Sequence, residues 1–326
     1  MGSSKQAEVL ARALGGNVVV KNVIYNPLIC LPNLVRPCGV GINFKKSDSL
    51  LSGVEAPDVI VSAGRRLAGA TIFLRRYFES KFSRRVKIVT ILNPNYNFRN
   101  FDLVILPLHD RVRHRIRDKN VLYINGSLCG PEIPVARSVR DHWEGGLESS
   151  RAPFFSLMIG GDTKGCRIDP VKLGLVVRKI SNYTDDRGGT LLVSTSRRTS
   201  ETCLREAKKW LRCDHHIYEW AENSTIPNPY YLFIEKSNLV FITGDSISMI
   251  SEVIAMGRPS YVYMPDEFQG TKQENFCKNL FDTGMARRID QSDSVVEEFV
   301  NNIAPNELEN VSKFVKNNIL GYAPTL

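Results

Sequence analysis

Short apolar runs alternate with amphipathic stretches along most of the chain, a pattern typical of strands that alternate with helices. The clearest case lies in the second half. An apolar run at 239–243 is followed there by a Gly-Asp-Ser turn, by apolar positions at helical spacing over 247–254, and by a second apolar run at 260–264. Strands joined by single helices form parallel sheets with right-handed crossovers. The pattern therefore predicts an α/β fold with mostly parallel sheets.

Two such α/β patterns follow one another along the chain. The 326 residues are enough for two domains with full hydrophobic cores. Between the patterns, Gly145-Gly146 and the polar residues 148–151 have the composition of a linker. We therefore expect one Rossmann-like domain over residues 1–150 and a second over residues 151–326.

The start of the first domain departs from the pattern. A Gly-Ser turn at residues 2–4 leads into a helical stretch that ends at Gly15-Gly16, as in a strand-to-helix loop, but no strand precedes the turn. Residues 17–24, NVVVKNVI, have the β-branched composition of a strand. We expect a strand at 17–24 and a first domain that lacks its first strand.

Basic residues are concentrated in the first half of the chain. Through Arg151 there are 23 Lys and Arg against 12 Asp and Glu, whereas the remainder has 20 against 22. Such an excess suits an anionic partner, for example a membrane surface, a nucleic acid or a phosphorylated acceptor. A basic excess that serves solubility alone is the alternative.

One basic cluster is interleaved with aromatic residues. Its basic members are Arg75, Arg76, Lys81, Arg84 and Arg85, and its aromatic members are Tyr77, Phe78 and Phe82. Basic side chains on lipid headgroups with aromatics at the interface would form a peripheral contact with an anionic membrane. A solvated helix face whose aromatics point into the core is the alternative. The chain has no RNP-type or GXXG signature, so we expect no nucleic-acid partner.

The remaining composition bears on location and on metal binding. No apolar run approaches the roughly 20 residues that cross a bilayer, and the N-terminus lacks the basic-then-apolar pattern of a signal peptide. The seven cysteines form no C-x-x-C pair and have no zinc-like spacing with histidine. We expect reduced thiols, no metal site, and a cytoplasmic protein with at most peripheral membrane contact.

Three successive strands of the second half end in loops that suit an anionic ligand. The loops read GGDTKG after 154–159, STSRRT from the end of 190–194, and TGDS from the end of 239–243. Glycine lets the backbone approach a ligand, arginine supplies positive charge, and free amides at the start of a helix favour an anion. Because the carboxyl ends of parallel strands lie at one edge of a sheet, the loops predict one pyrophosphate pocket. An ordinary set of turns with a capped helix is the alternative.

The predicted ligand-binding residues of this pocket are Gly160, Gly161, Asp162, Ser196, Arg197, Arg198, Thr243, Gly244, Asp245 and Ser246. Glu252 lies two turns into the following helix, where it would accept hydrogen bonds from ribose hydroxyls unless it pairs with a nearby arginine. Two α/β domains that face each other across a cleft lined by this edge form the architecture of GT-B nucleotide-sugar glycosyltransferases.

Several motifs resemble one family, in the same order and over nearly the whole chain. They are SAGRR (62–66), PLHD (107–110), IGGDTKGCRID (159–169), STSRRT (194–199), NPY (228–230) and TGDSISMISEVIAMGRPSYVY (243–263). The chain resembles the plant mitochondrial-fission factors of the elongated-mitochondria type and their bacterial homologues. The resemblance implies a GT-B-like fold. Plant members act at the mitochondrial outer surface beside a dynamin-related protein, a role that does not pass to bacterial members with the fold.

The second half also resembles the nucleotide-sugar domain of the lipid-linked N-acetylglucosaminyltransferase of peptidoglycan synthesis. That likeness implies a UDP-type nucleotide sugar as substrate, without a separate cofactor. It implies that Ser246 meets the diphosphate and Glu252 the ribose, and that Gln273 and Asn275 lie near the sugar. By the same likeness the first domain would hold the acceptor.

Transfer to an acceptor needs a general base, and the candidates are His109 and Asp110 at the end of a strand in the first domain. Relatives commonly carry a histidine in the first Gly-rich loop and an acidic residue ahead of NPY, whereas this chain has Gly2-Ser3-Ser4 and Pro227. Two functions stay open: a metal-independent glycosyltransferase with a membrane-associated acceptor, and a non-catalytic GT-B-like binding protein at a membrane surface. A GT-B-type sugar-nucleotide epimerase is a further alternative.

Overall fold

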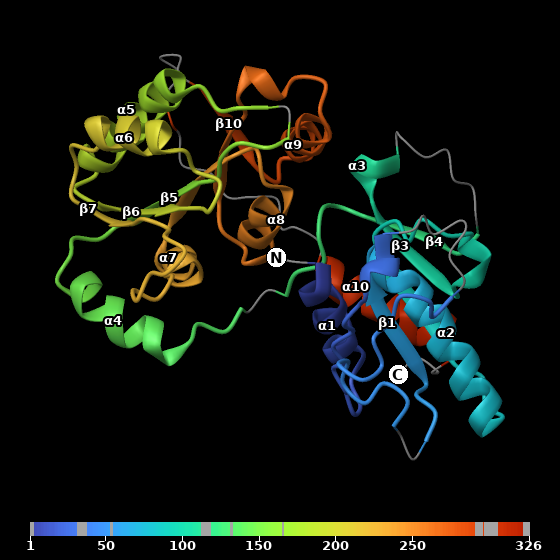
Figure 1. Ribbon diagram of the computed structural model, residues 1–326. Coiled ribbons are helices and arrows are strands. Elements are labelled where there is room, and N and C mark those ends of the chain that lie inside the picture. Colours follow the sequence, from blue (N-terminus) through green and yellow to red (C-terminus); the bar gives the residue numbers. More distant parts are fainter. Residues whose placement is uncertain are drawn as a thin grey trace. The chain divides into compact units, whose positions relative to one another are not determined.

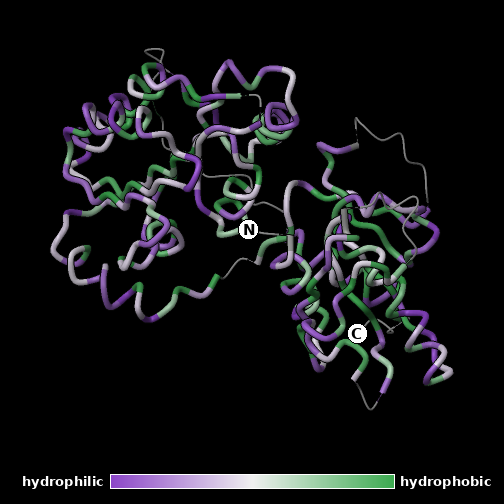
Figure 2. The backbone as a smooth tube through the Cα atoms, in the orientation of Figure 1, coloured by the Kyte–Doolittle hydropathy of each residue, from purple (hydrophilic) through white to green (hydrophobic). Residues whose placement is uncertain are grey.

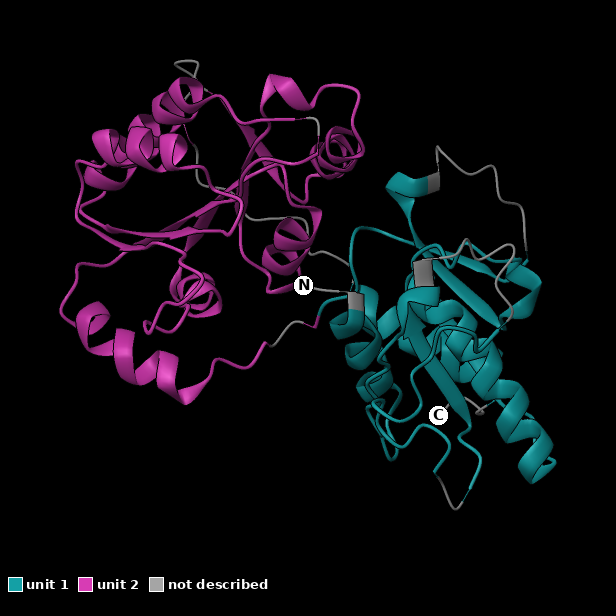
Figure 3. Ribbon diagram, in the orientation of Figure 1, with its two compact units in different colours: residues 1–129, 305–326 teal, residues 130–304 magenta. Residues whose placement is uncertain are grey.

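The computed structural model describes residues 3–30, 38–52, 55–111, 119–130, 133–164, 166–290, 296 and 306–321. The chain divides into two compact units, coloured teal and magenta in Figure 3. Unit 1 comprises Met1–Cys129 and Pro305–Leu326, and unit 2 comprises Gly130–Ala304. None of the helices in the described residues is long and apolar enough to cross a membrane.

Unit 1 is built on a four-stranded parallel sheet in the order β1-β2-β3-β4 (Figure 1). The strands are β1 (Val59–Ala63), β2 (Lys87–Ile91), β3 (Leu103–Pro107) and β4 (Val121–Ile124). The helices are α1 (Ser3–Leu14), α2 (Arg65–Phe82), α3 (Leu108–Arg111) and α10 (Glu307–Phe314). Two short 3₁₀ helices, η1 (Pro27–Cys30) and η2 (Phe98–Asn100), and a π-helical segment after α10, η4 (Val315–Leu320), complete the unit. Alternate strand residues pack on α1 and α10 on one face of the sheet and on α2 on the other.

Unit 2 is built on a six-stranded parallel sheet in the order β10-β9-β8-β5-β6-β7. The strands are β5 (Phe154–Ile159), β6 (Thr190–Thr195), β7 (His215–Tyr218), β8 (Leu239–Thr243), β9 (Ser260–Tyr263) and β10 (Arg287–Ile289). The helices are α4 (Arg137–Glu148), α5 (Pro170–Asp185), α6 (Glu201–Trp210), α7 (Tyr230–Lys236), α8 (Ile247–Ala255) and α9 (Lys272–Asp282), with a short turn η3 (Asp266–Phe268). Figure 2 shows the hydrophobic residues gathered along the central strands, which form the core of the unit.

Parallel sheets covered by helices confirm the predicted α/β, Rossmann-like fold class. The arrangement of the two units across a cleft stays a prediction.

The unit boundaries differ from the predicted domains 1–150 and 151–326. Unit 2 begins at Gly130 instead of residue 151, and the last residues of the chain, from Pro305, belong to unit 1. Gly145 and Gly146 lie inside α4 and not in a linker. Trp143 of α4 donates its indole N–H to the Pro227 carbonyl at 2.9 Å and packs edge-on against Phe233, so α4 belongs to unit 2. At the other end, α10 returns to unit 1, because its apolar residues share a core with α1.

The predicted strand at 17–24 is wrong. These residues are not paired in a sheet, and their end forms only an isolated bridge between Tyr25 and Ile42. Val19 and Val20 are 64% and 51% exposed. Among the described residues, no strand precedes β1, and β1 lies at the edge of its sheet. The backbone amides of Asn22 and Ile24 donate instead to side chains of the 43–48 loop, at Asp48 and Ser47.

Candidate functional site

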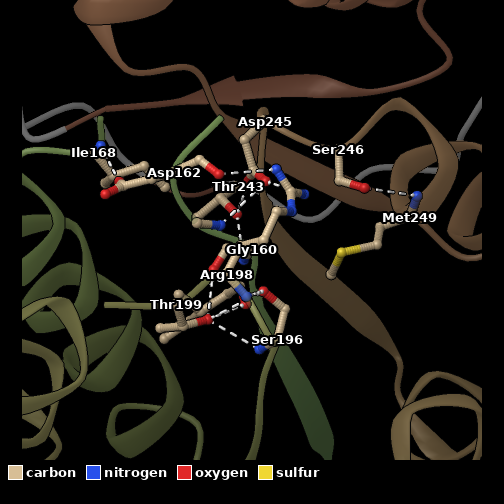
Figure 4. Close-up of polar contacts among 12 residues, drawn as sticks. Gly160, Asp162, Ile168, Ser196, Arg198, Thr199, Thr243, Asp245, Ser246 and Met249 are labelled. Carbon is tan, nitrogen blue, oxygen red and sulfur yellow. Dashed lines mark hydrogen bonds and ion pairs between the residues drawn. The ribbon is translucent and has the colours of Figure 1, made fainter. Parts of the chain in front are cut away.

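The carboxyl ends of β5, β6 and β8 meet at one point of the unit 2 sheet. These three strands are neighbours, with β5 in the middle. The chain leaves β5 toward β6 and returns to β8 on the other side of β5, so the strand order reverses between β5 and β8. Ligands of open α/β sheets bind at such a switch point. The structure therefore brings together the three loops that the sequence singled out (Figure 4).

Asp245 is the centre of this loop cluster. Its carboxylate accepts hydrogen bonds from the Thr243 hydroxyl at 2.6 Å and from the Gly161 amide at 3.1 Å, and it pairs with the Arg198 guanidinium at 2.7 Å. The Asp245 side chain is fully buried, whereas that of Arg198 is about one-third exposed. Burial raises the pKa of the Asp245 carboxyl, and the Thr243 hydrogen bond and the Arg198 charge oppose that rise. One carboxylate thus ties all three strand ends together.

The glycines of the first loop are required by this packing. The Gly160 amide donates to the Thr243 hydroxyl at 2.7 Å. A Cβ atom on Gly160 would lie 2.1 Å from an Asp245 carboxylate oxygen, and one on Gly161 would lie 1.9 Å from the Arg198 carbonyl oxygen. The Gly161 amide donates to Asp245, so both amides are already hydrogen-bonded within the protein. The close packing around both positions excludes any residue with a Cβ atom. Similarly, a Cβ on Gly244 would lie 2.5 Å from the Met264 sulfur.

The loop after β6 contains two arginines, of which Arg198 pairs with Asp245 and Arg197 is exposed. The Arg198 amide donates to the Ser196 hydroxyl at 3.2 Å, and the Arg198 side chain is held by Asp245. Arg197 is exposed and makes no hydrogen bond or ion pair with any other residue that the structure describes. Thr199 was not among the predicted ligand-binding residues, yet its hydroxyl accepts from the Ser196 amide at 2.9 Å and donates to the Ile159 carbonyl at 3.0 Å. Its only sequence signal was its place in a Ser/Thr-rich loop.

The remaining predicted residues of the first and third loops shape their own segments. Asp162 accepts a hydrogen bond from the Ile168 amide at 3.0 Å, which closes the loop before α5. Ser246 caps α8 by accepting from the Met249 amide at 3.4 Å. Glu252 of α8 is 2% exposed. The first turn of α8 therefore starts beside the loop cluster, and Glu252 lies inside the unit.

Gln273 and Asn275 lie in the first turns of α9, after β9. Gln273 is half-buried and Asn275 is exposed. Thr271 caps this helix by accepting from the Glu274 amide, and Glu274 accepts from the Gly270 amide at 2.6 Å. This reciprocal capping holds the amino end of α9, from which both predicted side chains project.

His109 and Asp110 belong to unit 1, where they form part of α3 after β3. The His109 Nε2 and Asp110 Oδ1 atoms are 3.9 Å apart, and the His109 side chain is 6% exposed. Their part in a site shared with the unit 2 loops stays a prediction.

The basic cluster at the end of α2 is largely paired with carboxylates. Asp102 lies 3.7 Å from Arg75, 3.5 Å from Arg85 and 3.4 Å from Lys87, and Arg84 pairs with Asp58. Phe78 is buried. Lys81 stacks over the Tyr77 and Phe82 rings, and Arg76 is exposed. Asp102 and Asp58 therefore offset part of the positive charge of this cluster, and its contact with a membrane surface stays a prediction.

Among the described residues, no group of three His, Cys, Asp or Glu side chains is placed to hold a metal ion. The sequence profile described as "Mitochondrial fission ELM1" matches residues 1–317. The chain belongs to this family. Family membership confirms the resemblance that the motifs indicated.

Two proteins that are similar to this chain in sequence come from a bacterium and a plant. An uncharacterised protein of Rickettsia prowazekii is 25% identical over 355 residues, covering 97% of this chain and 95% of that protein. The mitochondrial fission protein ELM1 of Arabidopsis thaliana is 24% identical over 292 residues, covering 84% of this chain and 64% of that protein.

Two solved structures in which the chain follows a similar path come from an archaeon and a bacterium. The UDP-GlcNAc 2-epimerase of Methanocaldococcus jannaschii has a TM-score of 0.47 and 11% identity, covering 80% of this chain and 77% of that chain. MurG of Acinetobacter baumannii has a TM-score of 0.39 and 12% identity, covering 81% and 67%.

Proposed function

We propose that unit 2 binds the diphosphate of a UDP-type nucleotide sugar at the carboxyl ends of β5, β6 and β8. The observation that carries the proposal is the meeting of three loops at the switch point, with the exposed Arg197 beside them and the start of α8 next to Asp245. Free amides at a helix start and an arginine are the groups that stabilise a diphosphate.

The charges of the cluster leave room for an anion. Asp245 and Arg198 neutralise each other, so the buried carboxylate adds no net negative charge to the loops. Arg197 has a full positive charge, and the start of α8 adds about half a positive charge. In the proposed complex Arg197 and the first amides of α8 contact the diphosphate. Gly160, Gly161 and Asp245 do not contact it and instead hold the loops together.

The rest of the nucleotide sugar would extend toward α8 and α9. Gln273 and Asn275, at the start of α9, are accessible enough to donate hydrogen bonds to sugar hydroxyls. Glu252 is buried, so its carboxylate could accept hydrogen bonds from the ribose only if the residues around it moved. We therefore give Glu252 the smallest part in the proposed contact.

The proposed reaction is transfer of the sugar to a membrane-associated acceptor. His109 or Asp110 would take the proton from the acceptor hydroxyl, and Arg197 with the α8 amides would stabilise the charge on the departing diphosphate. A second candidate is binding without transfer at a membrane surface. The family resemblance implies a histidine in the first loop and an acidic residue ahead of NPY. The chain has Gly2-Ser3-Ser4 and Pro227 at these places, which favours the second candidate.

Calorimetric titration with UDP tests the proposed binding. Replacing Arg197 by alanine removes a charge-assisted hydrogen bond worth about 1.5–3 kcal/mol, so we expect UDP affinity to fall by about 10- to 150-fold. Arg205→Ala is the matched control, because Arg205 is an exposed arginine on α6. No heat of binding with wild type, or equal affinities for wild type and Arg197→Ala, would contradict the proposal. Hydrolysis of UDP-sugars by the intact protein separates transfer from binding alone.

A further inference from the structure

The loops between α1 and β1, blue in Figure 1, carry most of the exposed large apolar side chains among the described residues. Six of nine such side chains lie here, and they are Val19, Val20, Ile24, Leu28, Val40 and Phe44. Their exposed fractions run from 36% to 64%. The other three, Val171, Ile226 and Phe314, lie on α5, before α7 and on α10. Single exposed apolar residues are ordinary, whereas a concentration of them marks an interaction surface.

Backbone hydrogen bonds hold two parts of these loops side by side. The Asn26 amide donates to the Gly41 carbonyl at 2.9 Å, and the Asn43 amide donates to the Ile24 carbonyl at 2.8 Å. Phe44 directly follows Asn43, so its backbone lies next to that of Ile24. The exposed side chains of the two parts therefore belong to one surface, which we call the loop surface (residues 19–28 and 40–46).

The inner side of these loops is anchored on α2 through an apolar cluster. Its members are Val23, Tyr25, Ile42 and Leu50 of the loops with Ala70, Phe73 and Leu74 of α2. Side chains of the 43–48 loop also fix the backbone, because Asp48 accepts from the Asn22 amide at 2.7 Å and Ser47 accepts from the Ile24 amide at 3.0 Å. The loops thus have one apolar side packed on α2 and a second apolar side that is exposed.

Lysines flank the exposed apolar residues. Lys45 and Lys46 follow Phe44 and are exposed, and their side chains form no hydrogen bond or ion pair with any other residue that the structure describes. Lys21 follows Val20 and donates to the Ser49 carbonyl at 3.1 Å. Lysine is depleted at protein–protein interfaces. Apolar side chains that enter the headgroup region, with lysines on the lipid phosphates, are instead typical of contacts with anionic membranes.

We propose that the loop surface docks on an anionic lipid membrane. It is distinct from the end of α2, where the sequence placed the membrane contact. There Phe78 is buried and Asp102 and Asp58 lie beside the basic side chains, whereas the loop surface combines exposed apolar side chains with lysines. This docking is the membrane contact that the proposed function calls for, and it does not depend on UDP binding by unit 2.

Sedimentation of the full chain with lipid vesicles tests the loop surface. The vesicles contain phosphatidylcholine alone or phosphatidylcholine with phosphatidylglycerol. We expect wild type to bind the anionic vesicles and to bind the neutral ones more weakly. Lys45→Gln/Lys46→Gln should bind the anionic vesicles about 30-fold more weakly, the effect of removing two lysines from an anionic surface. Val19→Ser/Val20→Ser should bind them at least about tenfold more weakly, because less apolar surface leaves water.

Matched control variants lie in unit 2 and at the end of α2. Val171→Ser/Ile226→Ser changes two side chains of unit 2 that are 62% and 45% exposed, and it should leave vesicle binding unchanged. Arg84→Gln/Arg85→Gln removes two charges at the end of α2 and should weaken vesicle binding less than the lysine variant does. Urea titration of each variant reports that it is folded, since substitutions at exposed positions change stability little.

Two results of the vesicle assay would overturn the lipid contact. One is no binding of wild type to anionic vesicles, or equal binding by wild type and both loop-surface variants. The other is a larger loss in Arg84→Gln/Arg85→Gln than in Lys45→Gln/Lys46→Gln, which would place the contact at the end of α2. A wild-type chain that stays off both kinds of vesicle but self-associates through Val19 and Val20 would reveal a polypeptide contact instead.

Calorimetric titration with UDP separates this docking from the proposed nucleotide site. We expect both loop-surface variants to bind UDP as wild type does. Absence of vesicle binding with UDP affinity retained would overturn the lipid contact alone. Absence of UDP binding with vesicle binding retained would overturn the nucleotide site alone.

Discussion

At the residue scale, Asp245 explains the composition of the loops around it. A buried carboxylate is stable only when hydrogen-bond donors and a cation surround it. The Gly161 amide, the Thr243 hydroxyl and the Arg198 guanidinium supply them. The sequence indicated that these residues lie close together. It could not indicate that several of them bind one another, because turn glycines and ligand-facing glycines have the same sequence signal.

Gly161→Ala tests the packing at this centre. The new Cβ would lie 1.9 Å from the Arg198 carbonyl oxygen, which is backbone and cannot rotate away. We expect a loss of about 1–3 kcal/mol in the free energy of unfolding, measured by urea titration. Gly145→Ala is the control, since no atom lies within 4 Å of its added Cβ and it lies inside helix α4. That variant should gain up to about 1 kcal/mol. Equal stability of the two variants would contradict the packing.

The raised pKa of Asp245 predicts a pH dependence. The folded chain holds this proton to higher pH than the unfolded chain, whose reference pKa is 3.8. The stability that this contributes is complete below the unfolded pKa and is lost as the pH rises through the folded pKa. The free energy of unfolding of wild type relative to Asp245→Asn should therefore fall as the pH rises above the unfolded reference pKa of 3.8. A relative stability that increases with pH over this range would show a lowered pKa instead.

At the element scale, the sequence predicted the buried central strands well and the boundaries of the units poorly. β5, β6 and β8 are mainly apolar or β-branched and are buried along almost their whole length, a pattern that has few alternatives to a central strand. The edge strands β7 and β10 read HHIY and RRI, which carry no such signal. Gly145-Gly146 indicated a linker, but tertiary packing of Trp143 and Leu147 overrides the low helix propensity of glycine.

Trp143→Ala tests whether α4 is part of unit 2. The substitution removes the hydrogen bond to the Pro227 carbonyl and the ring contact with Phe233. Because Trp143 is half-buried, we expect a loss of about 2 kcal/mol, below the range for fully buried tryptophans. Glu148→Ala, at an exposed position of the same helix, should leave the thermal midpoint nearly unchanged. The assignment of α4 fails if the two variants melt alike.

At the scale of the whole molecule, charge and proposed chemistry are divided between the units. Unit 1 has 22 Lys and Arg against 10 Asp and Glu, whereas unit 2 has 21 against 24. The asymmetry noted in the sequence therefore persists with the boundaries that the structure gives. The loop cluster lies wholly in unit 2, and the candidate bases lie in unit 1. Sequence patterns place such residues on strand ends, but they carry no information on how one unit meets the other.

The most direct measurement of the central claim is amide hydrogen exchange of the full chain with and without saturating UDP. If the diphosphate binds at the switch point of unit 2, peptides that cover 196–199 and 246–250 become protected, while those that cover β1 and β2 do not change. Loss of this protection in Arg197→Ala, with the apo exchange pattern retained, would locate the anion at the exposed arginine. Unchanged exchange at both loops under saturating UDP, or protection confined to unit 1, would contradict the account.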